Sequence, residues 1–126
     1  MEITTVIGCP IDCYYCPQDK LKIAYGNRPR IMTFEDFQFC IDKLPSTVTI
    51  YFSSIAEPWL NPQCTDMVLY ASGKGHPLAI YTTLVGMNKQ DWKRIKSLSY
   101  QIFNIYVADA LNKSHIPVNP TYKKLW

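Results

Sequence analysis

Apolar runs typical of β-strands recur at four places along the chain, with one amphipathic segment between each consecutive pair. The four runs cover residues 3–7, 47–52, 78–83 and 102–107. They are rich in β-branched and aromatic side chains, which are favoured in strands. The pattern therefore predicts four strands that alternate with helices.

The first amphipathic segment predicts a helix that begins at Thr33. Asp36 follows three residues later, as in a capping box, and Pro45 is expected to end the helix because it cannot continue the backbone hydrogen bonding. The face expected to be buried carries Phe37, Cys40, Ile41 and Leu44.

Two further helices are expected, one over residues 61–73 and one from residue 88. Asn61-Pro62 offers a cap followed by a proline in the first turn, and Asn88 with Asp91 offers a second capping pair. The faces expected to be buried carry Cys64, Met67, Val68 and Ala71 in the former helix, and Trp92, Ile95 and Leu98 in the latter. Asn119-Pro120 repeats the start signal for a fourth helix.

This alternation predicts an α/β fold, built from repeated βαβ units around a parallel sheet. Residues 17–32 show no clear periodicity, and we expect a solvated loop there. The basic side chains of this stretch are Lys20, Lys22, Arg28 and Arg30.

Composition narrows the class of protein. Hydrophobic residues make up 48% and charged residues 18% of the 126 residues, as in a folded domain with one core. No stretch approaches the roughly 20 apolar residues of a membrane span, and the N-terminus has no secretory signal. The net charge of +3 gives no argument for nucleic acid. Five cysteines, three of them clustered, favour metal chemistry in a reducing compartment, so we expect a cytoplasmic location.

The cluster consists of Cys9, Cys13 and Cys16, directly after the first strand. Three thiolates can hold a metal centre and leave one coordination position open, as reactive centres do. The alternative is a structural zinc site completed by His76 or His115. Cys40 and Cys64 are expected to be core residues instead, because free cysteine packs as a small hydrophobe.

The other candidate residues follow the later strands. In a parallel sheet, the loops after the strands gather at the carboxyl edge, where α/β proteins build their sites. Residues 53–59 follow the second strand, Thr82 and Thr83 end the third, and Asp109 follows the fourth. His76 precedes a strand, so we expect it at the opposite edge as a turn residue.

The cysteine spacing after a strand, together with Glu57-Pro58 after the second strand, resembles the radical S-adenosylmethionine (SAM) family. This resemblance implies a partial (β/α) barrel of about six βα units, of which about four are present. It makes residues 1–126 one radical SAM core domain, incomplete at its C-terminus and weak or inactive alone.

The resemblance also implies the cofactors and the enzymatic activity. Cys9, Cys13 and Cys16 would bind three irons of a 4Fe–4S cluster, and the fourth iron would bind SAM. Reductive cleavage of SAM would give a 5′-deoxyadenosyl radical that abstracts hydrogen from a substrate. An external one-electron reductant of the flavodoxin or ferredoxin type would be a partner. The residues identify no substrate.

Further site residues are implied by the same resemblance. Segment 52–58 resembles the family's glycine-glycine-glutamate-proline motif, which contacts the amino group of SAM, with Ser54 and Ala56 where glycine is usual. Thr83 lies where a Thr-Asn-Gly turn is common, and Asp109 where polar residues reach the ribose. Tyr15 matches an aromatic position near the adenine, although it could instead anchor its loop to the core.

Two alternatives to this enzyme stay open. The first is a non-catalytic module that binds zinc through the same cysteines. The second is an inactive, truncated radical SAM remnant that binds a cluster but does not complete the barrel.

Overall fold

The computed structural model describes residues 1–28, 30–53, 55–111, 113–118 and 123. The helix expected from Asn119-Pro120 and the candidate Ser54 lie outside the described residues. No helix in these described ranges is long and apolar enough to cross a membrane.

Four parallel strands form the sheet, as the sequence predicts. They are β1 (Glu2–Ile3), β2 (Ile50–Phe52), β3 (Leu78–Thr82) and β4 (Ile102–Ile105). Neighbouring strands in the sheet are also neighbours in the sequence, in the order β1-β2-β3-β4, and all three pairings are parallel. The α/β class and the parallel sheet are therefore confirmed.

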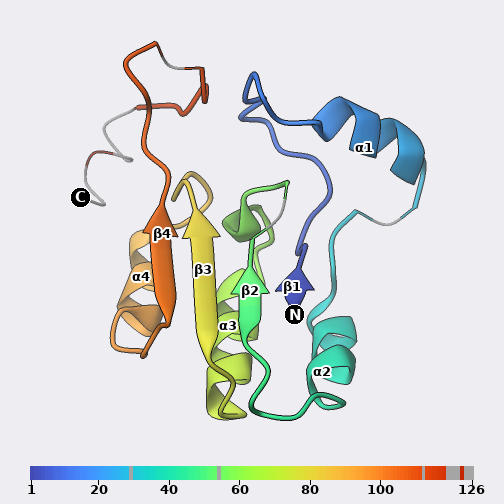
Figure 1. Cartoon of the computed structure of the whole chain (residues 1–126), viewed down its shortest axis with the longest axis vertical. Coiled ribbons are helices and arrows are strands. Elements are labelled where there is room, and N and C mark those ends of the chain that lie inside the picture. Colours follow the sequence, from blue (N-terminus) through green and yellow to red (C-terminus); the bar gives the residue numbers. More distant parts are fainter. Residues whose placement is uncertain (29, 54, 112, 119–122, 124–126) are drawn as a thin grey trace.

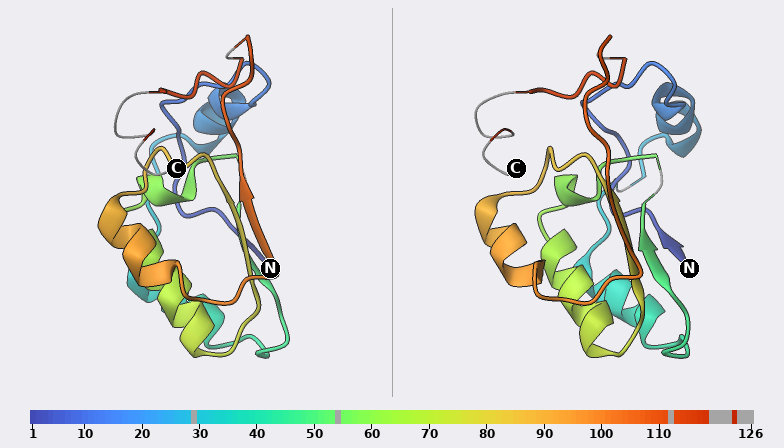
Figure 2. Two further views of the ribbon diagram at one scale, coloured as in Figure 1. Left: turned by 90° about the vertical axis from the view of Figure 1, so that its left-hand side faces the viewer. Right: turned by 60° about the vertical axis from the view of Figure 1, so that its left-hand side comes forward.

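In the described part of the chain, three helices cover one face of this sheet and none lies on the other face (Figures 1 and 2). The helices are α2 (Phe34–Ile41), α3 (Cys64–Gly73) and α4 (Lys89–Ile95), and a short 3₁₀ helix, η1 (Pro58–Leu60), precedes α3. Sequential strand order with all crossovers on one face is the winding of a (β/α) barrel, whereas a doubly wound sheet has helices on both faces.

The core lies between the sheet and these helices. Alternate strand residues point toward the helices, and Ile50, Phe52 and Ile80 are fully buried there. Phe37 of α2 packs against Phe52 with 5.8 Å between ring centroids. Ile95 is the fully buried residue of α4.

Both predicted capping pairs are confirmed. The Thr33 side chain accepts a hydrogen bond from the main-chain N–H of Asp36. Asn88 and Asp91 form a complete capping box at the start of α4, each side chain accepting from the other's main chain. The α3 boundary differs from the prediction. This helix begins at Cys64 because the Asn61 side chain first accepts from Gln63 N–H in a turn.

The first strand is shorter than predicted. β1 ends at Ile3, and the following residues leave the sheet to pair with residues 30–32. Val6 bridges Ile31 in antiparallel fashion, and the main-chain N–H of Ile7 donates to the oxygen of Arg30 at 2.7 Å. The chain thus turns away from the sheet just before the cysteine loop.

The prediction of a loop over residues 17–32 was wrong for its first half. Helix α1 (Gln18–Tyr25) forms there and ends at Gly26, whose φ of 65° lies in the left-handed region that favours glycine. Of its residues only Gln18 is buried. Without an apolar stripe this helix has no hydrophobic periodicity, although Lys, Leu and Ala favour helix.

Two residues expected in the core are exposed. Cys40 lies about 80° around α2 from the midpoint of the buried Phe37 and Ile41, taking about 100° per residue, so it falls outside the buried stripe. Trp92 is 39% exposed, and its ring makes a T-shaped contact with Phe103, with 5.8 Å between ring centroids.

Gly86, in the loop after β3, should not tolerate a side chain. A Cβ there would lie 2.4 Å from the main-chain carbon and oxygen of Trp59, which cannot move aside as a flexible side chain could. We expect Gly86→Ala to lower the free energy of unfolding by about 1–3 kcal/mol, measured by urea denaturation. Gly73→Ala is the matched control, since a Cβ there meets nothing within 4 Å. Equal stability of the two variants would contradict this packing.

Candidate metal and ligand site

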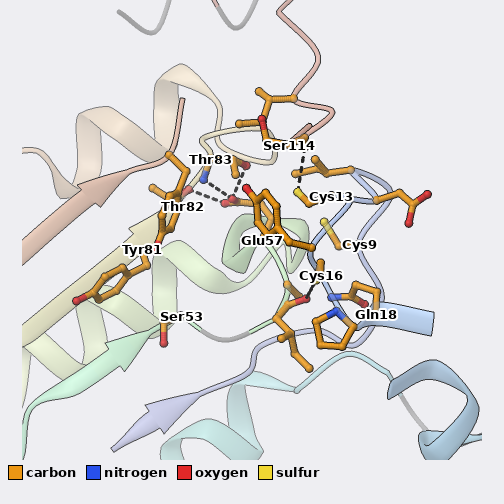
Figure 3. A pocket seen from close by; sticks show the side chains of 18 of the residues that line it. Cys9, Cys13, Cys16, Gln18, Ser53, Glu57, Tyr81, Thr82, Thr83 and Ser114 are labelled. Carbon is orange, nitrogen blue, oxygen red and sulfur yellow. Dashed lines mark hydrogen bonds between the residues drawn. The ribbon is translucent and has the colours of Figure 1, made fainter. Parts of the chain in front are cut away.

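A cavity of about 1050 Å³ opens at the carboxyl edge of the sheet, between the cysteine loop and the ends of β2 and β3 (Figure 3). It also extends over the helix-free face of the sheet, where Tyr51, Tyr81 and Tyr106 line it. The sequence-predicted residues on its wall are Cys9, Cys13, Cys16, Tyr15, Ala56, Glu57, Thr82 and Thr83. The fold thus brings together loops that are far apart in sequence, since Cys13 and Ser114, which also lines the cavity, are 101 residues apart.

The three cysteines of the loop are free thiols, each partly buried. The Cys13 thiol donates to the main-chain oxygen of Ser114 at 2.9 Å, and the Cys16 thiol contacts the Ile55 oxygen at 3.7 Å. Ser114 follows β4 and Ile55 follows β2, so contacts from two strand ends hold the loop (Figure 3). Main-chain bonds from Cys16 N–H to Cys13 O, and from Tyr14 N–H to Lys113 O, complete its support.

Two of these thiols hold their protons more tightly than usual. Burial is the largest cause that raises the pKa of Cys13, and the neighbouring Cys16 and Cys9 add to it. Burial also raises the pKa of Cys16, while a hydrogen bond from the main chain of Gln18 opposes that rise. Binding of a metal would therefore have to displace protons from these two sulfurs.

Buried polar atoms without a partner gather at the same site. Among the residues that the structure describes, the buried side-chain nitrogen and oxygen atoms without a hydrogen bond are Gln18 Nε2, Gln18 Oε1 and Ser114 Oγ. Both side chains line the cavity, Gln18 on the Cys16 side and Ser114 on the Cys13 side (Figure 3). Buried polar groups nearly always have partners, so this wall fits a polar group bound between the two side chains.

The Glu57 carboxylate is 3% exposed and joins the β2 loop to the end of β3. Its Oε1 accepts from the Thr82 hydroxyl at 2.6 Å and from Trp59 N–H at 3.3 Å. Its Oε2 accepts from Thr83 N–H at 2.6 Å and from the Thr83 hydroxyl at 2.7 Å. A carboxylate has about four acceptor positions. The protein's own donors therefore fill them, and Glu57 holds the two loops together.

The remaining candidates are placed differently. Tyr15 is 69% exposed at the cavity mouth, so it does not anchor its loop to the core. Ala56 lines the cavity, and Ser54 lies outside the described residues. Trp59 packs away from the site, where its indole N–H donates to the Thr65 hydroxyl of α3 at 3.0 Å. Asp109 is not part of the cavity wall.

Asp109 instead organises the turn after β4. Its carboxylate accepts from the main-chain N–H groups of Leu111, Lys113 and Ser114 at 2.9–3.1 Å. These bonds, led by the one from Lys113, hold the pKa of Asp109 below its usual range. Since Lys113 and Ser114 contact the cysteine loop, Asp109 supports the site through main-chain geometry.

This turn should therefore loosen in acid. A carboxyl whose pKa is lowered in the folded state stabilises the fold above the pKa of unfolded aspartate, about 3.9, and this contribution is lost as the pH falls through the lowered pKa. We expect the hydrogen-exchange protection of the Leu111 and Ser114 amides to decrease as the pH falls through that range. Asp109→Asn should weaken protection at neutral pH and remove its acid dependence. If the protection of these amides still depends on pH in Asp109→Asn, a group other than Asp109 causes that dependence.

The two histidines differ in position. His76 is buried at the opposite end of the sheet, where its Nδ1 lies 2.9 Å from the Val48 oxygen, so its prediction as a structural residue is confirmed. His115 is exposed and follows Ser114. Within the described ranges, no three His, Cys, Asp or Glu side chains converge closely enough for one metal ion. In a 4Fe–4S cluster each thiolate binds a different iron, whereas zinc would require the three sulfurs to meet at one ion.

Sequence reasoning missed Gln18, Ser114 and the tyrosine-lined sheet face. The β-strand alternation could have indicated the tyrosines, because Tyr51 and Tyr81 each lie between two buried residues of their strand and so point to the opposite face. No sequence signal marks Gln18 or Ser114, whose importance comes from burial without partners. The chain matches no protein-family model and no curated protein.

Proposed function

We propose that this chain is a radical SAM enzyme domain, in which Cys9, Cys13 and Cys16 hold a 4Fe–4S cluster with one iron open to SAM. When bound, the cluster and SAM supply reductive cleavage of the sulfonium and a 5′-deoxyadenosyl radical that takes hydrogen from a substrate. The sheet would be about four of the six βα units of the family's partial barrel.

The observation that carries this proposal is that three clustered thiols and the Glu57-Pro58 segment meet at one cavity. They come from the loops after β1 and β2, at the carboxyl edge of a sequentially wound parallel sheet. Active sites of barrel-type α/β folds lie at this edge. The unpartnered Gln18 and Ser114 atoms beside the thiols add support from an independent feature.

The chain's own residues would bind, orient and shield. The thiolates ligate metal, and Glu57 fixes the β3 loop so that the main chain near Thr83 keeps one position. Tyr15 offers an exposed ring on which a purine can stack. The helix-free face with Tyr51 and Tyr81 would form the floor for the substrate. An external one-electron reductant would complete the system.

Anaerobic reconstitution with iron and sulfide, followed by SAM and dithionite, tests this function. We expect a small yield of 5′-deoxyadenosine, measured by chromatography, from the wild-type chain, because about four of six βα units would make a weak catalyst, and none from Cys13→Ala. A chain that takes up a full complement of iron yet forms no 5′-deoxyadenosine would contradict the enzymatic proposal and favour an inactive remnant. Stoichiometric zinc binding in place of iron would favour the non-catalytic module.

A further inference from the structure

We infer that Gln18 and Ser114 are hydrogen-bond donors to the sulfurs of the metal centre and set its reduction potential. This inference rests on the proposed function, and it concerns two residues that belong to neither the cysteine motif nor the Glu57-Pro58 segment. It follows from where the structure leaves buried polar atoms without partners.

Gln18 is 2% exposed, yet both atoms of its carboxamide lack a hydrogen bond. It is the first residue of α1, two residues after Cys16, and both residues line the cavity (Figure 3). The main chain of Gln18 opposes the burial that raises the pKa of the Cys16 thiol. A buried amide without a partner is costly, so a group absent from the free chain is expected to complete it.

Ser114 makes the equivalent arrangement on the opposite side. It is 3% exposed, and its hydroxyl has no partner. Its main-chain oxygen accepts from the Cys13 thiol at 2.9 Å. When Cys13 binds metal as a thiolate, that proton is lost, and the sulfur becomes an acceptor. The unpartnered Ser114 hydroxyl is then a donor already present at the same residue.

The chemistry of these hydrogen-bond donors determines in which direction they shift the reduction potential. The amide N–H groups of Gln18 and the hydroxyl of Ser114 can donate to sulfur that carries negative charge. The reduced centre carries one more negative charge than the oxidised centre, so it gains more from these donors. Hydrogen bonds to the sulfurs therefore raise the reduction potential, and their removal should lower it.

Gln18→Leu in the reconstituted protein tests the inference, with the midpoint potential measured by a redox titration monitored by electron paramagnetic resonance (EPR). We expect the equilibrium constant for reduction to fall about tenfold, which is about 59 mV for a one-electron couple. Gln18→Glu should shift the potential further in the same direction, because it removes the donors and adds a negative charge. Ser114→Ala should also lower the potential.

Matched controls separate this role from a general effect of substitution. Gln90→Leu on α4 and Ser99→Ala before β4 change exposed residues away from the cavity, and both should keep the wild-type potential. Metal-free Gln18→Leu should melt at the same temperature as the wild type or higher, since it no longer buries an unpartnered amide. Selective ¹⁵N labelling of glutamine side chains should give a hyperfine coupling that Gln18→Leu loses.

The two proposals fail in different ways. If the wild-type chain takes up no iron, the proposed function itself is wrong. If the wild type and both Gln18 variants load iron fully and share one midpoint potential, the cluster assignment stands and this inference is overturned. If an ordered water is the only partner of Gln18, the midpoint potentials of the wild type and the Gln18 variants would be equal in this way.

Discussion

Replacing Cys9, Cys13 or Cys16 singly by alanine is expected to abolish assembly of the cluster. Two thiolates do not hold the cubane, and the structure places all three on one loop whose contacts from Ser114 and Ile55 are specific to Cys13 and Cys16. Iron and sulfide should be quantified per chain after anaerobic reconstitution. Full iron content in any of the three variants would remove that cysteine from the ligand set.

The other two cysteines provide the controls. Cys64 is fully buried in α3, where burial raises the pKa of its thiol well above the usual value. Cys64→Ala should retain iron and lose about 1 kcal/mol of stability through the small cavity it leaves. Cys40 is exposed, so Cys40→Ala should retain iron and change stability by less than about 0.5 kcal/mol.

Replacing Glu57 is the second substitution with a large expected effect. Glu57→Ala leaves the donors of Thr82, Thr83 and Trp59 without their acceptor in a buried place. Each unsatisfied buried donor costs about 1–3 kcal/mol, and the hydroxyls can turn to other partners, so we expect a total loss of about 2–4 kcal/mol. The stability of Glu57→Gln should lie between that of the wild type and that of Glu57→Ala, because the amide keeps one acceptor oxygen. Urea denaturation measures both.

Glu35→Ala on α2 is the matched control for Glu57→Ala, since that exposed carboxylate lies in the first turn of a helix away from the cavity. Its stability should change by no more than about 0.5 kcal/mol. Glu57→Ala with the unfolding midpoint of the wild type would show that the four hydrogen bonds of the carboxylate contribute nothing, and would contradict the role of Glu57 in joining the loops.

The contacts of Glu57 also bear on how it would affect SAM. A direct contact with the ligand's ammonium predicts a fall in affinity of about 10- to 100-fold in Glu57→Ala. Thr83→Val distinguishes contact from positioning, because it frees an acceptor position on Oε2. If Glu57 acts on the ligand directly, Thr83→Val should keep or raise affinity, measured by calorimetry. If Glu57 acts by holding the β3 loop, Thr83→Val should lower affinity as well.

Local patterns predicted the elements that face the core. In β2 the buried Ile50 and Phe52 flank Tyr51 of the open face, and the Asn88–Asp91 pair caps a helix as expected. The same patterns could not predict α1, because a helix that buries only Gln18 leaves no apolar periodicity. They wrongly assigned Cys40 and Trp92 to the core, since helical spacing predicts which residues share a helix face but not how much of that face is buried.

The candidate site, like the fold, could be predicted from the sequence only in part. Residue spacing was enough to predict that the three cysteines lie at the carboxyl edge, because parallel strands bring their following loops together. The partners of each side chain depend on tertiary contacts that no spacing encodes. Four donors reach Glu57, and three main-chain amides occupy Asp109, so two residues predicted to touch a ligand are engaged by the protein itself.

The EPR spectrum of the reconstituted, dithionite-reduced chain, recorded with and without SAM, tests the central claim most directly. A cluster whose other three irons are held by three protein thiolates, with the fourth iron open to SAM, predicts about four irons and four sulfides per chain and a spectrum of a reduced 4Fe–4S centre whose g-values change when SAM is added. A chain that binds iron with a spectrum unaltered by saturating SAM, or that binds no iron, would contradict the account.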